Sequence, residues 1–306
     1  ALITHSIFFC VFSVFLMGVQ SCLSSPSKYG IIKDIEGEEK IAYGNGMMEM
    51  MSFVGILLGT ILGTMLSELV SIWIICALML LFTTISFITV YRLKIVEIPS
   101  EKPIFNTINP IRYMIESFRF AQKYKGINDA VLGSSIFWMI AGMLQLNLVI
   151  HCRQTLELSN IGTGLCMSSA AVGIALGCVF AGKILRSDNA FRMINIGLLA
   201  MNIFLLLIIV FNPNVYIFSL LMFGVTFFGG IFEVPCLAIV QRAPIGRIVG
   251  DMMAYLNFAN FVLVLIGTAI FYAVSAFFNE SSIAIFTSIE VILFLSLIYF
   301  VFKFRK

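Results

Sequence analysis

The sequence has little charge for its length and almost no histidine. Only 11% of its 306 residues are charged, and only 2 are His. Neither His is followed by Asp at the His-x-x-x-x-Asp spacing that a phospholipid acyltransferase would use, and Gly182-Lys183 leads into Ile184 instead of completing a phosphate-binding loop. We therefore predict that the chain is not an enzyme or an ATP-driven pump and that it carries no cofactor.

Paired cysteines and a large net charge are also lacking. The 7 Cys residues occur singly, without a Cys-x-x-Cys pair, so they indicate neither a disulfide framework nor a metal site. The net charge is only +3. A charge of this size is explained by attraction to anionic membrane lipids, so we predict no nucleic-acid partner.

Apolar residues, in contrast, are abundant. They make up 60% of the chain, and the mean hydropathy of +1.04 excludes an ordinary soluble domain. A transmembrane helix needs roughly 20 consecutive apolar residues. We predict nine such spans, at about 5–24, 43–66, 69–91, 130–151, 160–182, 193–211, 214–238, 251–276 and 282–302.

The basic residues are distributed unevenly between the gaps that separate these spans. Of the 19 Lys and Arg residues, 18 fall in alternate gaps and only Arg153 falls in the others. Cytoplasmic loops carry an excess of Lys and Arg, so this pattern predicts a multi-pass membrane protein whose C-terminus is cytoplasmic. Because few residues precede the first span, we expect further spans upstream of Ala1.

The largest interruption is the polar segment 92–129. Within it Ile111, Met114, Ile115 and Phe118 recur at helical spacing, which predicts an amphipathic helix at the cytoplasmic interface; the alternative is a solvated linker. Three spans precede the segment and six follow it. We therefore divide the chain into a partial N-terminal bundle (1–91), a cytoplasmic linker (92–129) and a C-terminal six-helix bundle (130–306), as in a six-plus-six transporter without its first three helices.

Small residues recur every fourth position in two of the spans. Such rows form smooth helix faces on which a neighbouring backbone can pack closely. The two rows are Gly55, Gly59 and Gly63 in the second span, and Gly173, Gly177 and Ala181 in the fifth.

Several segments resemble the lysophospholipid transporter family of the major facilitator superfamily. They are Ser25 to Ile31, Asn45 to Glu49 with the glycine row after it, Ser134 to Trp138, Leu144 to Asn147, and Gly229 to Gln241. The resemblance implies an all-α fold of twelve helices in two bundles, of which this chain matches helices four to twelve. It also implies transport of lysophospholipid across the bacterial inner membrane for reacylation. The Gln145-Leu146-Asn147 pattern is more similar to relatives fused to an acyltransferase and an acyl-carrier-protein synthetase, so these enzymes are expected partners.

Candidate substrate-binding residues are the polar groups within the spans, because a polar group at the membrane midplane is costly unless it faces a cavity or a partner. Glu49 and Glu233 are the first candidates, to bind a substrate ammonium or to couple transport to a proton. The alternative for Glu49 is a helix-end carboxylate near Lys28 or Asn45. Glu290 is a weaker candidate and can equally pair structurally.

Amides and one basic segment complete the set. Gln145 and Asn147 lie on different faces of their helix, so at most one of them should face the cavity. Asn257 and Asn260 share a face by their i,i+3 spacing and either line the cavity or form interhelical hydrogen bonds. The other candidates are Lys28 and Tyr29, placed where a headgroup phosphate would emerge; the alternative is a basic cytoplasmic anchor beside an aromatic interface residue. His151 is predicted to be a residue of the external interface and not a ligand.

Together these observations predict a secondary transporter that moves lysophospholipid, of the lysophosphatidylethanolamine type, by alternating access. One alternative is a facilitator for a small solute or drug. The other is a membrane scaffold or degenerate fragment that transports nothing. A lateral opening wide enough for an acyl chain would favour the lipid over the small solute, and a collapsed, fully apolar interior would favour the scaffold.

Overall fold

The structure is a computed structural model that describes residues 6–37, 40–92, 109–186, 188–245 and 248–303, apart from some side chains in the first two helices. Within these ranges the regular structure is entirely helical. The helices are α1 (Ile7–Glu36), α2 (Ile41–Leu69), α3 (Ile72–Arg92), α4 (Pro110–Ala121), α5 (Ile127–Ile150), the π-helical turn η2 (His151–Thr155), α6 (Asn160–Ile184), α7 (Ala190–Phe211), α8 (Val215–Arg242), α9 (Val249–Phe277) and α10 (Ser282–Lys303).

Eight of these helices are long and apolar enough to cross a membrane. They are α2, α3, α5 with η2, and α6 to α10, and they correspond to eight of the nine predicted spans. The first predicted span falls on α1, whose described apolar stretch is Ile7–Ser21. The prediction of an all-α polytopic membrane protein is therefore confirmed.

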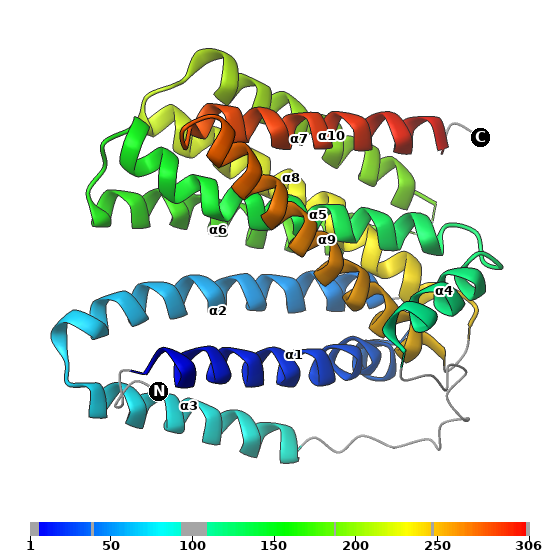
Figure 1. Ribbon diagram of the computed structural model, residues 1–306. Helices are drawn as coiled ribbons and strands as arrows, with labels where there is room; N and C mark the ends of the chain where they lie inside the picture. Colours follow the sequence, from blue (N-terminus) through cyan, green and yellow to red (C-terminus); the bar gives the residue numbers. More distant parts are fainter. Residues whose placement is uncertain (1–5, 38–39, 93–108, 187, 246–247, 304–306) are drawn as a thin grey trace.

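Helices α5 to α10 pack on one another, with α8 lying between α6 and α7, and α5 lying on α9. Figure 1 shows α1, α2 and α3 as a separate group below them. That group is joined to the others where α2 packs on α6 and α8 and where α1 packs on α9. None of the described side chains of α3 is buried. Since they are almost all apolar, they suit contact with lipid.

Only one of the two glycine rows mediates close helix packing. A Cβ at Gly177 would lie 2.0 Å from the carbonyl oxygen of Phe227, and one at Gly173 would lie 2.6 Å from that of Phe223, so α6 and α8 meet backbone to backbone. A Cβ at Gly55 or Gly59 would meet nothing within 4 Å. The prediction that these two glycines pack against a neighbour was therefore wrong as far as the described residues are concerned; Gly63 lies outside the described side chains.

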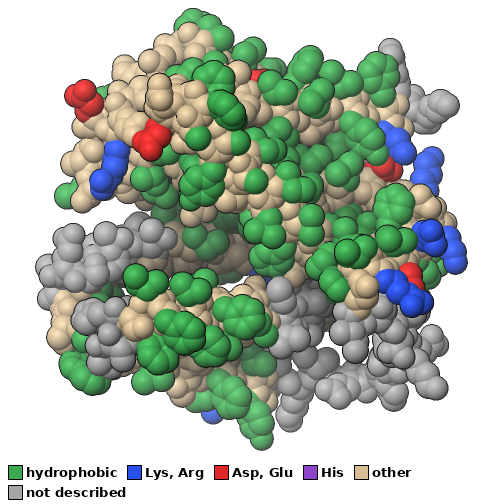
Figure 2. Space-filling view, in the orientation of Figure 1, with side chains coloured by type: hydrophobic (Ala, Val, Ile, Leu, Met, Phe, Trp, Pro, Cys, Tyr) green, Lys and Arg blue, Asp and Glu red, His purple; other side chains and the backbone are tan. Residues whose placement is uncertain are grey.

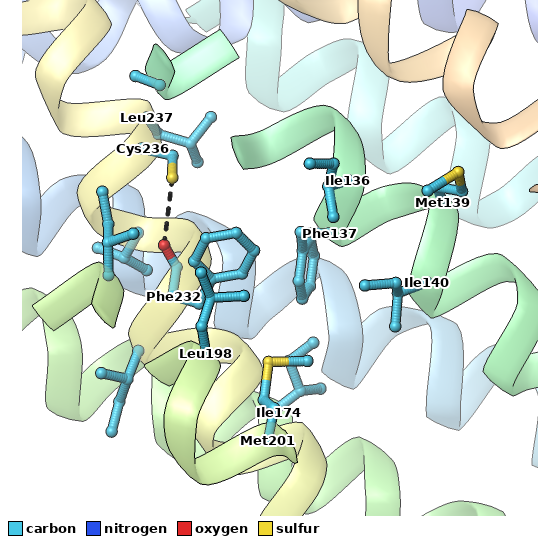
Figure 3. Packing of buried hydrophobic residues seen from close by; sticks show 14 of the residues in the cluster. Ile136, Phe137, Met139, Ile140, Ile174, Leu198, Met201, Phe232, Cys236 and Leu237 are labelled. Carbon is cyan, nitrogen blue, oxygen red and sulfur yellow. Dashed lines mark hydrogen bonds between the residues drawn. The ribbon is translucent and has the colours of Figure 1, made fainter. Parts of the chain in front are cut away.

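The core of the larger group is formed by apolar side chains from all six helices, α5 to α10. Figure 3 shows Phe137 of α5 facing Phe232 of α8, with Met201 of α7 and Ile174 of α6 beside them. The Phe137 and Phe232 rings are 6.4 Å apart at an interplanar angle of 68°. Dispersion between such closely packed groups holds helices together where lipid offers no hydrophobic driving force.

The two ends of the bundle differ in charge. Figure 2 shows Lys and Arg gathered at the end that carries α4 and the C-terminal end of α10, which we call the basic end. The opposite end carries the turns α2–α3 and α9–α10. Its described charges are Arg153, Glu157 and Glu280.

Helix α4 occupies the polar segment between α3 and α5. Asn109 caps it by accepting hydrogen bonds from the backbone N–H groups of Ile111 (3.0 Å) and Arg112 (3.2 Å), and Pro110 occupies the first position. The Tyr113 hydroxyl donates to the backbone oxygen of Asp251 at 3.0 Å, which fixes α4 to α9. Burial raises the pKa of Tyr113 to about 12, so this hydroxyl stays a neutral donor at physiological pH.

Candidate functional site

A cavity of about 390 Å³ lies between α2 and the larger group of helices, and we call it the central cavity. This volume is within the range of roughly 300–1,000 Å³ typical of small-molecule sites. Figure 2 shows the hollow between the upper and lower groups of helices. The lining is almost entirely apolar and includes Phe53, Leu57, Ile140, Leu144, Leu148, Met167, Ile174, Met201, Met222, Val225 and Phe261; its polar side chains are Gln145, Thr226 and the indole of Trp138.

Two stacked aromatic rings bound this cavity toward the basic end. Phe53 of α2 and Trp138 of α5 have ring centroids 6.1 Å apart and an interplanar angle of 18°. On each of three helices, the lining residue nearest the basic end marks this boundary: Phe53 on α2, Phe137 on α5 and Gly229 on α8. The ring pair therefore forms the floor of the cavity.

Two buried carboxyl groups lie one helical turn beyond this floor. Glu49 precedes Phe53 on α2, and Glu233 follows Gly229 on α8; they are 1% and 0% exposed. Glu49 is close enough to act electrostatically on Glu233. Among the described residues, Glu233 Oε2 has no partner at hydrogen-bond geometry, although the indole of Trp138 is close enough to interact with the carboxyl group. An unsatisfied buried oxygen is costly, which makes this atom a candidate ligand for a cation or a proton.

A chain of hydrogen bonds fixes the other oxygen of Glu233. The Ser134 hydroxyl donates to Glu233 Oε1 at 2.7 Å, and Asn260 Nδ2 donates to the Ser134 hydroxyl at 3.4 Å. The Ser135 hydroxyl then donates to Asn260 Oδ1 at 2.8 Å. These bonds connect α8, α5 and α9, so the carboxyl group is held in one position by three helices.

A basic side chain lies in the same layer. Lys28 Nζ of α1 donates to the Ser52 hydroxyl at 2.9 Å. Ser52 is three residues after Glu49 and shares its helix face. The Lys28 ammonium therefore approaches the face of α2 that carries Glu49. The side chain of Tyr29 lies outside the described residues.

Still nearer the basic end, α2 closes against α6 and α8. Asn45 Nδ2 donates to Gln241 Oε1 at 2.5 Å across this contact. A Cβ at Gly46 would lie 2.5 Å from the carbonyl oxygen of Cys178, so the backbones of α2 and α6 touch here. Further along α2, Ile56 and Leu62 are 51% and 47% exposed. The central cavity is thus closed toward the basic end, while Ile56 in its lining stays exposed.

Of the remaining predicted residues, one lines the central cavity and the others lie outside its lining. Gln145 lines the central cavity, whereas Asn147 is buried and donates to the backbone oxygen of Ser282 at 3.1 Å. Asn257 is half-buried one turn before Asn260. Glu290 is half-buried in α10, away from the lining of the central cavity.

The prediction for His151 was wrong. Its side chain is 0% exposed, and its ring lies 4.4 Å from that of Phe218 and 5.2 Å from that of Phe286. Its Nδ1 is 3.0 Å from the Ser282 hydroxyl. The π-helical turn explains the difference, because it continues α5 through His151 and turns this residue into the bundle.

Several residues that build the site were not among the predicted substrate-binding residues. These are Asn45, Phe53, Ser134, Ser135, Trp138 and Gln241. Two neighbouring hydroxyl groups inside an apolar span are a usable signal, because they must find partners within the membrane. The aromatic pair carries no such signal, since Phe is common throughout this chain.

Comparison with known proteins gives a consistent result. The sequence profile described as Major Facilitator Superfamily matches residues 1–268. Curated relatives named lysophospholipid transporter LplT are 28% identical over 236 residues in Serratia proteamaculans (strain 568) and 26% identical over 231 residues in Photorhabdus laumondii subsp. laumondii. These alignments cover 74% of this chain but 56% and 57% of the relatives. The chain therefore spans a little over half the length of the curated relatives it matches.

Proposed function

This chain belongs to the Major Facilitator Superfamily, and from that premise we propose that it forms the core of a secondary transporter for lysophospholipid in a bacterial inner membrane. The observation that carries the proposal is the sequence of layers along the bundle. An apolar cavity is followed by an aromatic floor and then by a buried layer with two carboxyl groups and a lysine. An amphiphile has the same division between an apolar chain and a charged headgroup.

Each part of a lysophosphatidylethanolamine molecule has a matching group in this arrangement. The acyl chain would occupy the central cavity, where it meets side chains as apolar as lipid. When the floor opens, the headgroup ammonium would reach Glu49 and Glu233, and the phosphate would reach Lys28. A facilitator for a small polar solute fits poorly, because only three polar side chains line the cavity among the residues that the structure describes. A scaffold with a collapsed interior fits poorly too, because the bundle encloses the central cavity.

Alternating access follows from the contacts of α2. We place the basic end in the cytoplasm, because cytoplasmic loops are rich in Lys and Arg. The closure at Asn45 and Gln241 then makes this the outward-facing state. Residues 1–91 and 130–306 would rock against each other, joined by the segment 92–129. Reacylation of the delivered lipid would belong to an acyltransferase with an acyl-carrier-protein synthetase, as separate partners.

Occupation of the central cavity can be tested by fluorescence quenching. The chain has 2 Trp residues, so a Trp73→Phe variant leaves Trp138 at the cavity floor as the reporter. We expect lysophosphatidylethanolamine with a brominated acyl chain to quench Trp138 saturably. Adding Ala171→Phe, which fills the cavity from α6, should abolish this quenching.

The matched control is Leu165→Phe, which adds a ring to a side chain of α6 that is 68% exposed. It should leave quenching unchanged. Equal quenching in both variants would show that the lipid reaches Trp138 only from the surrounding membrane or micelle, and would overturn cavity binding. Uptake of labelled lysophosphatidylethanolamine into spheroplasts, by this chain alone and by a version preceded by three further helices, tests transport itself.

The closure at the basic end should depend on Asn45. In a variant that keeps Cys178 as its single cysteine, Asn45→Ala removes the hydrogen bond to Gln241. A side-chain hydrogen bond contributes about 0.5–1.5 kcal/mol, so labelling of Cys178 by a maleimide added at the basic end should rise about two- to tenfold. Asn147→Ala, which removes a buried amide elsewhere, is the control. No difference between the variants would mean that this bond does not hold the closure.

A further inference from the structure

A second cavity of about 510 Å³ lies at the basic end, between α4, α5, α9 and α10. We call it the basic-end pocket. It is separate from the central cavity. On α5 the basic-end pocket is lined by residues before Phe137, whereas the central cavity is lined by Phe137 and residues after it. The buried chain from Ser135 through Asn260 and Ser134 to Glu233 runs from the wall of this pocket to the layer below the central cavity.

The pocket has an apolar wall and a charged mouth. Its wall is built from Val131, Leu132, Ala259, Val262 and Leu263, with Met114 and Phe118 of α4 covering one side. Its ionisable side chains at the mouth include Lys125, Lys303, Asp129 and Tyr299. The two lysines outnumber the one carboxylate, so the mouth is positively charged.

Hydrogen bonds hold the mouth in place. The Tyr299 hydroxyl donates to Asp129 Oδ1 at 2.7 Å, and Lys303 Nζ lies 3.6 Å from the same oxygen. An ammonium group has three donors, and this single contact leaves Lys303 able to bind an anion at the same time. On the other side of the pocket, the Tyr255 hydroxyl donates to Asn128 Oδ1 at 3.2 Å, and Asn128 Nδ2 donates to the backbone oxygen of Phe118 at 3.1 Å.

The position of α4 indicates where a ligand would come from. Ile111, Ile115 and Phe118 are 71%, 46% and 45% exposed along one face of this helix, beside Arg112 and Arg119. An amphipathic helix of this kind lies in the interface plane of a membrane, with its apolar face in the acyl region. The mouth of the pocket is therefore at the level of the lipid headgroups.

We propose that the basic-end pocket binds a resident diacyl phospholipid from the adjacent leaflet. Its headgroup phosphate would contact Lys125 and Lys303, and one acyl chain would lie on the wall formed by Val262 and Leu263. The bound lipid braces α4 against α5, α9 and α10. It is distinct from the lysophospholipid that we propose for the central cavity.

The test is native mass spectrometry of the detergent-purified chain titrated with dioleoyl phosphatidylglycerol. We expect one tightly retained lipid, with its affinity lowered about thirtyfold in the double variant Lys125→Gln/Lys303→Gln, since each basic residue near an anionic headgroup has an effect of about fivefold. The control is Lys183→Gln/Arg186→Gln, which removes two exposed charges at the same end but outside the pocket. It should retain the lipid as the unchanged chain does.

Two further arms separate this site from other sources of phosphate binding. Val262→Phe narrows the apolar wall and should weaken lipid retention while both lysines remain. Ala171→Phe blocks only the central cavity and should leave retention unchanged. Three results would each overturn the proposal: equal retention in the two charge variants, displacement of the lipid by glycerol phosphate at equal concentration, or loss of the lipid in Ala171→Phe. None of them bears on lysophospholipid transport.

Discussion

Replacing Glu233 with Gln is expected to weaken binding of lysophosphatidylethanolamine about ten- to hundredfold, because hydrogen bonds to charged groups contribute about 1.5–3 kcal/mol. Glu233 Oε2 is buried with no hydrogen-bond partner among the described residues, and the substrate ammonium would supply one. Gln keeps an oxygen that can accept the hydrogen bond from the Ser134 hydroxyl. Its side chain also has nearly the same volume as that of Glu. The loss should therefore come from the missing charge. Quenching of Trp138 by the brominated lipid measures the affinity.

Two comparisons make this result specific. Glu290→Gln changes a half-buried carboxyl group in α10, away from the central cavity, and should leave binding intact. Lysophosphatidylglycerol has no ammonium group, so its binding should change little in Glu233→Gln. An equal loss for both lipids would mean that Glu233 supports the fold and does not contact the headgroup.

Replacing Gly177 with Ala is expected to cause the largest loss of stability among conservative changes in the spans. The added Cβ would lie 2.0 Å from the Phe227 carbonyl oxygen and 2.8 Å from its carbonyl carbon. These are backbone atoms, which cannot move aside as a flexible side chain can, so α6 and α8 must separate. Overpacking typically costs about 1–3 kcal/mol, and this site should reach the upper part of that range. Thermal unfolding in detergent, followed by size-exclusion chromatography, measures the effect.

The matched control is Gly59→Ala, because a Cβ at Gly59 meets nothing within 4 Å. It introduces the same methyl group into a row with the same spacing. We expect its midpoint of unfolding to equal or slightly exceed that of the unchanged chain, since Ala favours helix over Gly by about 1 kcal/mol. If both variants unfold at the same lowered temperature, the contact between α6 and α8 is looser than the structure indicates.

The layers of the site also suggest how the two halves communicate. Glu49 lies on α2 of the first group of helices, and Glu233 lies on α8 of the second group. In the transport that we propose, a substrate cation placed between these carboxyl groups would be held by both groups at once. Binding would then be coupled to the rocking of the two groups through one pair of residues.

The sequence by itself determined the helices, because a backbone in lipid must satisfy its hydrogen bonds within the segment, and a long apolar stretch can do so only as a helix. It also distinguished the two ends, since each Lys or Arg must reach water or headgroups. It identified Glu49 and Glu233 for the same reason, as both are ionisable groups at a depth where a charge is costly.

Only the tertiary structure decided which face of each helix meets a neighbour. Gly177 packs and Gly59 does not, although both belong to rows of the same spacing. Gln145 lines the cavity while Asn147, two residues later, is buried against α10. Asn45 pairs with Gln241 across 196 positions of sequence. Apolarity averaged over a span contains no information on helix rotation, and rotation is set by the packing of side chains from distant segments.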